Sequence, residues 1–170
     1  PGVLANAASG WAFSVTGPMY LAWTLAHALL LSDLPNGRDW LVMTLATVFA
    51  IDTASYLVGK PLGRTPMAPT ISPGKTWEGA AGGLLAAIGA TIGVVAFADE
   101  ISSLYAQAAG LGLAIGVISQ IGDLAESKLK RIARVKDSGI LIPGHGGLMD
   151  RLDSLLLIFP LVSLASRLWD

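Results

Sequence analysis

The sequence predicts an all-α fold and a polytopic integral membrane protein with about five transmembrane helices. Of its 170 residues, 53% are hydrophobic and only 14% are charged, and the mean hydropathy is +0.62. Soluble domains carry about 25% charged residues. Here the apolar residues occur in long uncharged blocks rather than in amphipathic stripes. The composition therefore argues against a soluble globular fold.

Five stretches are long and apolar enough to cross a bilayer, which takes about 20 residues of helix. They cover residues 13–31, 40–58, 79–98, 104–122 and 148–168. Three glycine pairs at i, i+4 spacing predict close helix approach within the bilayer. They are Gly79 and Gly83, Gly89 and Gly93, and Gly112 and Gly116. The stretch 59–74, rich in glycine and proline, is predicted to be a loop with turns.

Basic residues are concentrated in two of the links between these stretches. The link between the second and third stretches holds Lys60, Arg64 and Lys75, and the link between the fourth and fifth holds five more of the 11 lysines and arginines. The opposite links are acidic on balance. Since short cytoplasmic loops carry the excess of Lys and Arg, both basic links are predicted to face the cytoplasm. The chain has no cysteine, which excludes disulfides and thiolate chemistry.

Acidic residues gather at the same membrane face as the basic links. Asp52 lies about two turns before the end of the second stretch, Asp123 and Glu126 end the fourth, and Asp150 and Asp153 begin the fifth. Each carboxylate could simply pair with a nearby lysine or arginine. Together, however, they suit Mg²⁺, which takes one or two carboxylates plus substrate phosphate oxygens. Basic side chains and glycine-rich backbone suit the phosphates, so the pattern predicts a site for phosphoryl or nucleotidyl transfer.

The most specific pattern lies between residues 122 and 154. It reads Gly122-Asp123-Leu124-Ala125-Glu126-Ser127, then Lys130-Arg131, Lys136-Asp137, Pro143-Gly144-His145-Gly146-Gly147 and Asp150-Arg151-Leu152-Asp153-Ser154. Before it come Asp52-Thr53-Ala54-Ser55-Tyr56 and Ser72-Pro73-Gly74-Lys75-Thr76-Trp77-Glu78-Gly79. These segments closely resemble the signature of the phosphatidate cytidylyltransferases, or CDP-diacylglycerol synthases, and occur in the same order. One departure is Gly74, which stands where that family's pattern has Lys.

The resemblance implies an enzyme of phospholipid biosynthesis that converts CTP and phosphatidic acid to CDP-diacylglycerol and pyrophosphate. It implies a single transmembrane catalytic domain over residues 1–170, without the family's N-terminal helices. Such a protein is expected in the inner (plasma) membrane, with its active site facing the cytoplasm. The expected partners are CTP, phosphatidic acid, the lipid bilayer and a second copy in a homodimer, with no nucleic acid. The expected cofactor is Mg²⁺, and a second, monovalent cation is left open.

The resemblance also implies roles for residues of the basic links and the acidic cluster. Metal ligands are expected at Asp123, Asp150 and Glu126, and catalytic roles at Asp123, Asp150, Lys136, Arg151 and Asp153. Substrate contacts are expected from Lys75, Thr76, Ser127, Lys130, Arg131, His145, Gly146, Gly147 and Asp52. Two roles stay open: His145 either bonds a phosphate or stabilises a turn, and Asp52 with Tyr56 either holds a second cation or braces the basic loop.

Three other functions fit parts of the pattern. A CTP-dependent lipid kinase would keep the CTP site and change the reaction, and a cytidylyltransferase for an ether lipid phosphate would change the lipid. An ion-coupled transporter would need acids deep within the spans, on a path through the bilayer. Here the acids lie mainly at one leaflet, which disfavours a transporter.

Overall fold

The computed structural model describes residues 2–98, 105–132 and 149–169, with side chains at residues 11, 14–98, 105–132 and 154–169. These residues form five helices and one two-stranded hairpin. The helices are α1 (Gly2–Ser32), α2 (Gly37–Leu62), α3 (Trp77–Phe97), α4 (Tyr105–Ile132) and α5 (Met149–Trp169), and the strands are β1 (Pro66–Ala68) and β2 (Ser72–Thr76). Each predicted apolar stretch corresponds to one helix, so the all-α fold class is confirmed.

Three of the described helices are long and apolar enough to cross a membrane. They are α2, α3 and α4, with mean hydropathies of 1.7, 2.0 and 1.5, whereas the described apolar part of α5, Ser154–Trp169, is shorter. Large apolar side chains lie on the outer surface, where Leu85 is 71% exposed and Phe49 is 66% exposed. A helical surface of this kind suits lipid, because a helix satisfies its own backbone hydrogen bonds.

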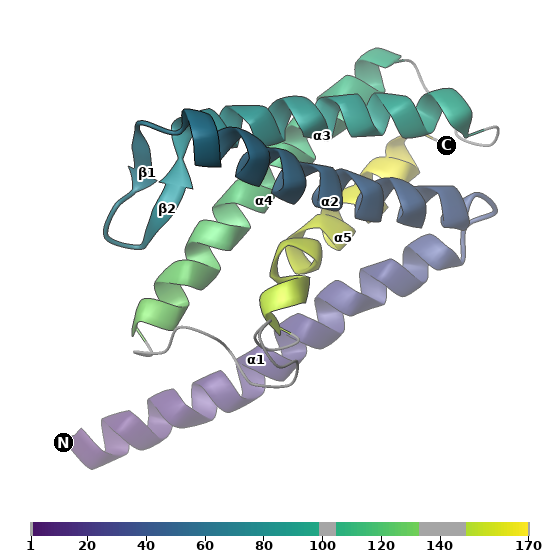
Figure 1. The fold of residues 1–170 in the computed structure, drawn as a ribbon. Coiled ribbons are helices and arrows are strands. Elements are labelled where there is room, and N and C mark those ends of the chain that lie inside the picture. Colours follow the sequence, from purple (N-terminus) through teal and green to yellow (C-terminus); the bar gives the residue numbers. More distant parts are fainter. Residues whose placement is uncertain (1, 99–104, 133–148, 170) are drawn as a thin grey trace.

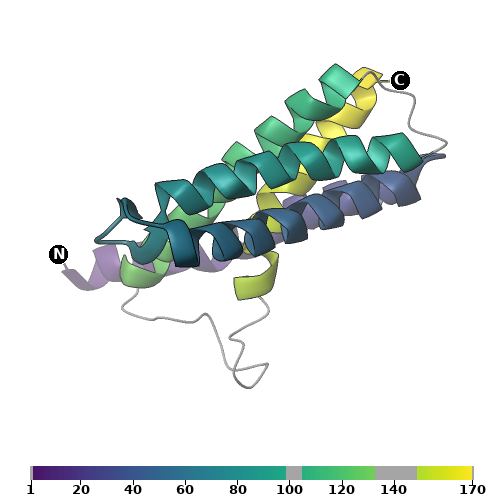
Figure 2. The ribbon, with the colours of Figure 1, turned by 45° about the horizontal axis from the view of Figure 1, so that its top comes forward.

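The helices form a bundle whose two ends differ in chemistry. In both ribbon views the hairpin and the end of α4 lie at one end and the C-terminus lies at the other (Figure 1, Figure 2). We refer to the hairpin end as the basic end, because it carries Lys60, Arg64, Lys75, Lys128, Lys130 and Arg131. At the opposite end Trp40 of α2 packs on Trp169 of α5, with ring centroids 5.2 Å apart. Fully buried apolar residues of the bundle include Leu31, Met43, Ile115 and Ile158.

Two of the three predicted glycine pairs lie where helices approach closely. A Cβ atom on Gly79 would come within 2.8 Å of the Ser55 carbonyl oxygen, and one on Gly83 would overlap the Ser55 hydroxyl. These two glycines therefore let α3 pack against α2. Gly112 and Gly116 lie against α3 in the same way, and a Cβ atom on Gly112 would come within 2.8 Å of the α3 backbone. The packing prediction is confirmed for both pairs.

The third pair, Gly89 and Gly93, lies on an open face of α3. A Cβ atom at either position would have no described atom within 4 Å. The packing prediction is therefore wrong for this pair within the described part of the chain. The i, i+4 spacing permits close approach, but only the tertiary arrangement decides whether a neighbouring helix uses it.

The segment predicted to be a loop contains a β-hairpin. Its two strands are antiparallel, with Pro66 opposite Thr76 and Ala68 opposite Ser72. Thr76 is also the N-cap of α3, since its hydroxyl accepts a hydrogen bond from the Gly79 amide at 3.2 Å. This bond satisfies one of the free amides in the first turn of the helix. The hairpin therefore leads directly into α3, which fixes the position of β2.

Glu78, in the first turn of α3, closes the base of the hairpin. Its carboxylate accepts hydrogen bonds from the Thr65 amide at 3.2 Å and from the Thr65 hydroxyl at 2.9 Å. The Thr65 carbonyl in turn accepts a bond from the Trp77 amide at 3.0 Å. These contacts join the start of the hairpin to the start of α3, so the hairpin keeps one position relative to the bundle.

Candidate active site at the basic end

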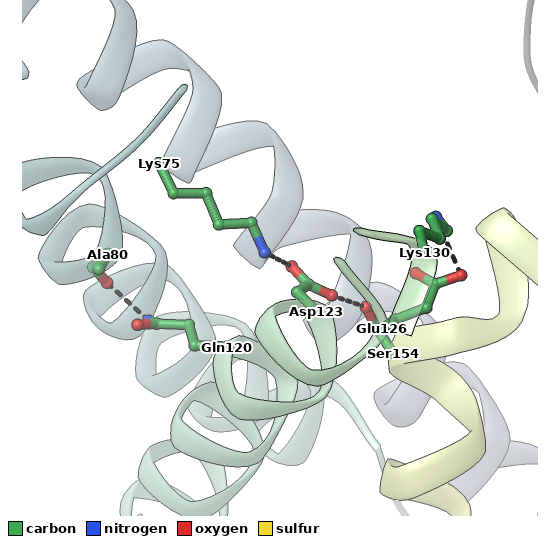
Figure 3. Close-up of polar contacts among 7 residues, drawn as sticks. All are labelled: Lys75, Ala80, Gln120, Asp123, Glu126, Lys130 and Ser154. Atoms are coloured by element: carbon green, nitrogen blue, oxygen red, sulfur yellow. Dashed lines mark hydrogen bonds and ion pairs between the residues drawn. The ribbon is translucent and has the colours of Figure 1, made fainter. Parts of the chain in front are cut away.

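Asp123 is the residue on which three distant segments of the chain converge. It lies on α4, and Lys75 at the end of the hairpin approaches one of its oxygens, with Nζ 2.9 Å from Oδ2. Ser154 of α5 donates a hydrogen bond from Oγ to the other oxygen, Oδ1, at 2.6 Å. Figure 3 shows the two contacts on opposite sides of the carboxylate. The hairpin, α4 and α5 are thus tied together through one side chain.

A cavity of about 490 Å³ lies beside Asp123. This volume falls within the range of small-molecule binding sites, roughly 300–1,000 Å³. The cavity is lined from α2, the hairpin, α3 and α4 by Ile51, Asp52, Ser55, Tyr56, Gly59, Lys60, Met67, Gly74, Lys75, Thr76, Gly79, Ala80, Gln120 and Asp123. The wall therefore combines two carboxylates, two ammonium groups and several glycines with a few apolar side chains.

The charges of the cavity wall are partly hydrated. The side chains of Lys75 and Asp123 are 31% and 23% exposed, so their ion pair lies between a surface pair and a buried one. On the α2 side, Lys60 donates a hydrogen bond from Nζ to the Tyr56 hydroxyl at 2.9 Å, and Nζ lies 5.2 Å from the centre of the Tyr56 ring. Lys60 is therefore the group that engages Tyr56, and both residues line the cavity with Asp52.

The structure brings together four of the site residues predicted from the sequence. Asp52, Lys75, Thr76 and Asp123 all line the cavity, although they come from three different elements, α2, β2 and α4. The Thr76 hydroxyl accepts the capping hydrogen bond of α3. Its position in the wall is therefore set by the fold.

Four other predicted residues lie on the last turns of α4 and do not line the cavity. Glu126 pairs with Lys130 one turn further along the helix, with Oε1 3.0 Å from Nζ (Figure 3). Arg131 donates a hydrogen bond from Nε to the Ile71 carbonyl of the hairpin at 3.3 Å. Ser127 lies between them in the sequence. The expected substrate and metal contacts of these residues stay predictions.

The remaining predicted site residues fall outside what the structure describes. These are Lys136, His145, Gly146 and Gly147, and the side chains of Asp150, Arg151 and Asp153. Positions 150, 151 and 153 belong to the first turns of α5, which begins at Met149. Their backbone therefore directly precedes Ser154, the α5 residue that reaches Asp123.

Ser154 and Gln120 are among the residues of the site that were not predicted. Ser154 closes the quoted motif that begins at Asp150, but nothing in the sequence pairs it with a residue 31 positions earlier. Gln120 lines the cavity and donates a hydrogen bond from Nε2 to the Ala80 carbonyl at 2.9 Å, which joins α4 to α3 (Figure 3). Its spacing of three residues before Asp123 places both on one helix face. That spacing is the signal that could have identified Gln120.

The described donor groups fit a metal ion that is shared with a phosphate ligand. The described residues contain no group of three or more His, Cys, Asp or Glu side chains that could enclose a metal. Mg²⁺ does not need such a cage, because it binds through one or two carboxylates and completes its shell with water and phosphate oxygens. Asp123 meets this requirement: its carboxylate has about four lone-pair sites, and Lys75 and Ser154 occupy one each.

Fold and site together define a helical membrane protein with a carboxylate–lysine cavity at one end of its bundle. The chain belongs to the cytidylyltransferase family, whose sequence profile matches residues 4–169. That match includes all five helices, apart from the first two residues of α1, and it includes the hairpin.

Several curated relatives carry the name phosphatidate cytidylyltransferase. The one from Brucella melitensis is 42% identical over 154 residues, which cover 87% of this chain and 54% of the relative. The one from Mycobacterium tuberculosis is 45% identical over 125 residues, which cover 71% of this chain and 36% of the relative. The uncharacterized protein YnbB of Escherichia coli is 39% identical over 151 residues, covering 89% of this chain and 49% of the relative. The chain thus spans about half the length of the curated relatives it matches.

Proposed function

We propose that this chain catalyses the reaction for which its relatives are named, in which CTP and phosphatidic acid give CDP-diacylglycerol and pyrophosphate. The observation that supports this most is the convergence of three motif segments on one carboxylate. Lys75 of the hairpin and Ser154 of α5 both bond to Asp123 of α4. The family match over residues 4–169 includes all three segments.

In the proposed reaction a phosphate oxygen of phosphatidic acid attacks the α-phosphorus of CTP. One P–O bond forms there, the P–O bond to the β-phosphate breaks, and pyrophosphate leaves with the electron pair. No protein nucleophile is required, so the residues act through position and charge. Lys75 and Lys60 place ammonium groups on the cavity wall, where they can bind phosphate oxygens. Gly74 has no described atom within 4 Å of its Cβ position, so a phosphate can approach the backbone there closely.

We propose that Asp123 and Asp150 would hold Mg²⁺, with Glu126 as an outer ligand. The bound ion would neutralise phosphate charge and stabilise the pyrophosphate leaving group. Asp123 is suited to this role because it lines the cavity and is bonded to both the hairpin and α5. Asp52 lies on the α2 wall of the same cavity and is our candidate for a second cation.

We further propose that the protein resides in the inner membrane with its basic end toward the cytoplasm, and that it forms a homodimer. The orientation is supported by the basic residues of the hairpin segment and of the end of α4, which lie at one end of the bundle. The dimer is supported by the family resemblance alone.

The reaction can be tested by following each phosphate of CTP separately. The purified chain, supplied with phosphatidic acid and Mg²⁺, receives CTP labelled either at the α-phosphate or at the γ-phosphate. Cytidylyl transfer puts the α-label into lipid and releases the γ-label as pyrophosphate. A lipid kinase would put the γ-label into lipid instead, and phosphatidic acid with ether-linked chains tests the alternative lipid. ATP should replace CTP poorly, and excess chelator should stop turnover.

Asp123→Asn is the variant expected to be inactive in this assay. It keeps the size of the side chain and removes the charge, so label transfer should fall to background while the protein stays folded. Asp33→Asn makes the same change at an exposed position before α2, at the other end of the bundle, and should leave transfer unchanged. Absence of the α-label from lipid with the wild-type protein would contradict the proposal.

A further inference from the structure

Ser154 is a buried residue whose hydroxyl bonds across helices. It is only 4% exposed and donates to Asp123 Oδ1 at 2.6 Å, a length typical of a hydrogen bond from a hydroxyl to a carboxylate. Several other buried hydroxyls in the bundle bond to the backbone of their own helix. Thr44 bonds to the Trp40 carbonyl and Thr91 to the Ala87 carbonyl. The Ser154 contact, in contrast, joins α5 to α4.

The two partners of Asp123 differ in their access to a ligand. Lys75 lines the cavity and is 31% exposed, so its ammonium group can turn toward an entering phosphate. Ser154 does not line the cavity and is almost completely buried. It can therefore keep its bond to Oδ1 while the partner of Oδ2 changes. Because the Oδ1 oxygen of Asp123 is held by a residue outside the cavity wall, the carboxylate keeps a fixed orientation toward the cavity.

The same bond sets the spacing of two helices. Ser154 is one helical turn after position 150, and its contact with Asp123 joins α5 to α4 at that level. Positions 123 and 150 are the two proposed metal ligands. A hydrogen bond beside both of them would therefore control the distance between the segments that carry them.

We propose that Ser154 is a positioning residue that orients Asp123 and sets the α4–α5 spacing for metal binding. This inference rests on the proposed function, because it takes Asp123 to be a metal ligand. Residues that orient metal ligands in this way typically change metal affinity or activity by about 10–100-fold when they are replaced.

The test measures metal binding directly, without turnover. The purified chain is titrated with Mn²⁺ in the absence of nucleotide, and free Mn²⁺ is followed by electron paramagnetic resonance. Ser154→Ala should raise the dissociation constant by about 10–100-fold. Ser154→Thr keeps the hydroxyl and should bind Mn²⁺ at least about tenfold more tightly than Ser154→Ala does. Thermal unfolding without metal checks that each variant is folded.

Ser163→Ala is the matched control. Ser163 lies on the same helix, is 3% exposed, and is about 13.5 Å further along the axis from Ser154. Its replacement should leave the dissociation constant unchanged. Should Ser154→Ala not fold, Ser154→Cys takes its place with the same expected direction, because a thiol is a weak donor.

The outcomes separate this inference from the function on which it rests. If the wild-type chain binds no Mn²⁺, both the proposed metal site and the role of Ser154 fail. If the wild type binds Mn²⁺ and Ser154→Ala binds it equally well, only the role of Ser154 is overturned. An equal loss of Mn²⁺ affinity in Ser154→Ala and Ser163→Ala would also overturn the role of Ser154, since the effect would then come from general packing of α5.

Discussion

Replacing Lys75 with Met tests whether its ion pair with Asp123 serves the reaction or the fold. The charged atoms are 2.9 Å apart and the side chains are 31% and 23% exposed. Two charges about 4 Å apart attract by about 4 kcal/mol at an effective dielectric constant of about 20. Desolvation and side-chain ordering offset most of this, and exposed pairs contribute about 0.2–1 kcal/mol to stability. Since 1 kcal/mol corresponds to about 2–4 °C at this chain length, Lys75→Met should lower Tm by no more than about 4 °C.

The effect of Lys75→Met on turnover should be much larger. A hydrogen bond to a charged phosphate contributes about 1.5–3 kcal/mol, which corresponds to about a 10–160-fold loss of kcat/KM at 1.36 kcal/mol per tenfold. The measurement is kcat/KM for CTP at saturating phosphatidic acid, with Tm from the same samples. Lys128→Met removes an exposed lysine at the same end of the bundle and should leave both values near wild type. A Lys75→Met protein with wild-type kcat/KM would refute the assignment of Lys75 to substrate phosphate.

Three further predictions concern packing, the hairpin and topology. Gly83→Leu would force α3 away from the Ser55 hydroxyl and should reduce the free energy of unfolding by about 1–3 kcal/mol, which lowers Tm. Gly89→Leu, on the open face of α3, should not change Tm, and equal effects of the two substitutions would contradict the packing argument. Arg131→Ala removes a hydrogen bond to the hairpin that contributes about 0.5–1.5 kcal/mol. It should speed amide hydrogen exchange at residues 66–76 without changing exchange in α3, and unchanged exchange in the hairpin would refute that contact. In whole cells an impermeant thiol reagent should label Ser32→Cys and leave the hairpin variant Thr70→Cys unlabelled, and the reverse pattern would invert the orientation.

The sequence predicted the helices well because their signal is local. Each apolar stretch needs only its own residues to be identified, and a helix in lipid satisfies its own backbone groups. The hairpin was not predicted, because strands of three and five residues interrupted by Pro66, Pro73 and Gly74 show no alternating pattern. Its stability comes from pairing between the strands and from the Thr65–Glu78 contacts, which join residues 13 positions apart. Such pairing is invisible in a short window of sequence.

The site was predicted as a set of residues at one membrane face but not as a network. Charge counting placed Asp123 and Lys75 at the same leaflet, and the structure makes them an ion pair across 48 residues. The same reasoning grouped Glu126 with Asp123, yet Glu126 pairs with Lys130 along its own helix. Helix spacing alone could not show whether Glu126 acts with Asp123 or pairs with Lys130, because both residues lie within one turn of Glu126 on α4.

The packing of α3 on α2 and the position of Lys75 belong to one structural arrangement. Gly79 lies against the Ser55 carbonyl and Gly59, and its amide is capped by Thr76, the residue that follows Lys75. Any substitution that moves α3 away from α2 therefore also moves the strand that delivers Lys75 to Asp123. A carboxylate near the end of a membrane span is costly unless it is paired or hydrated. The glycines of α3 thus help to satisfy Asp123, although none of them carries a functional group.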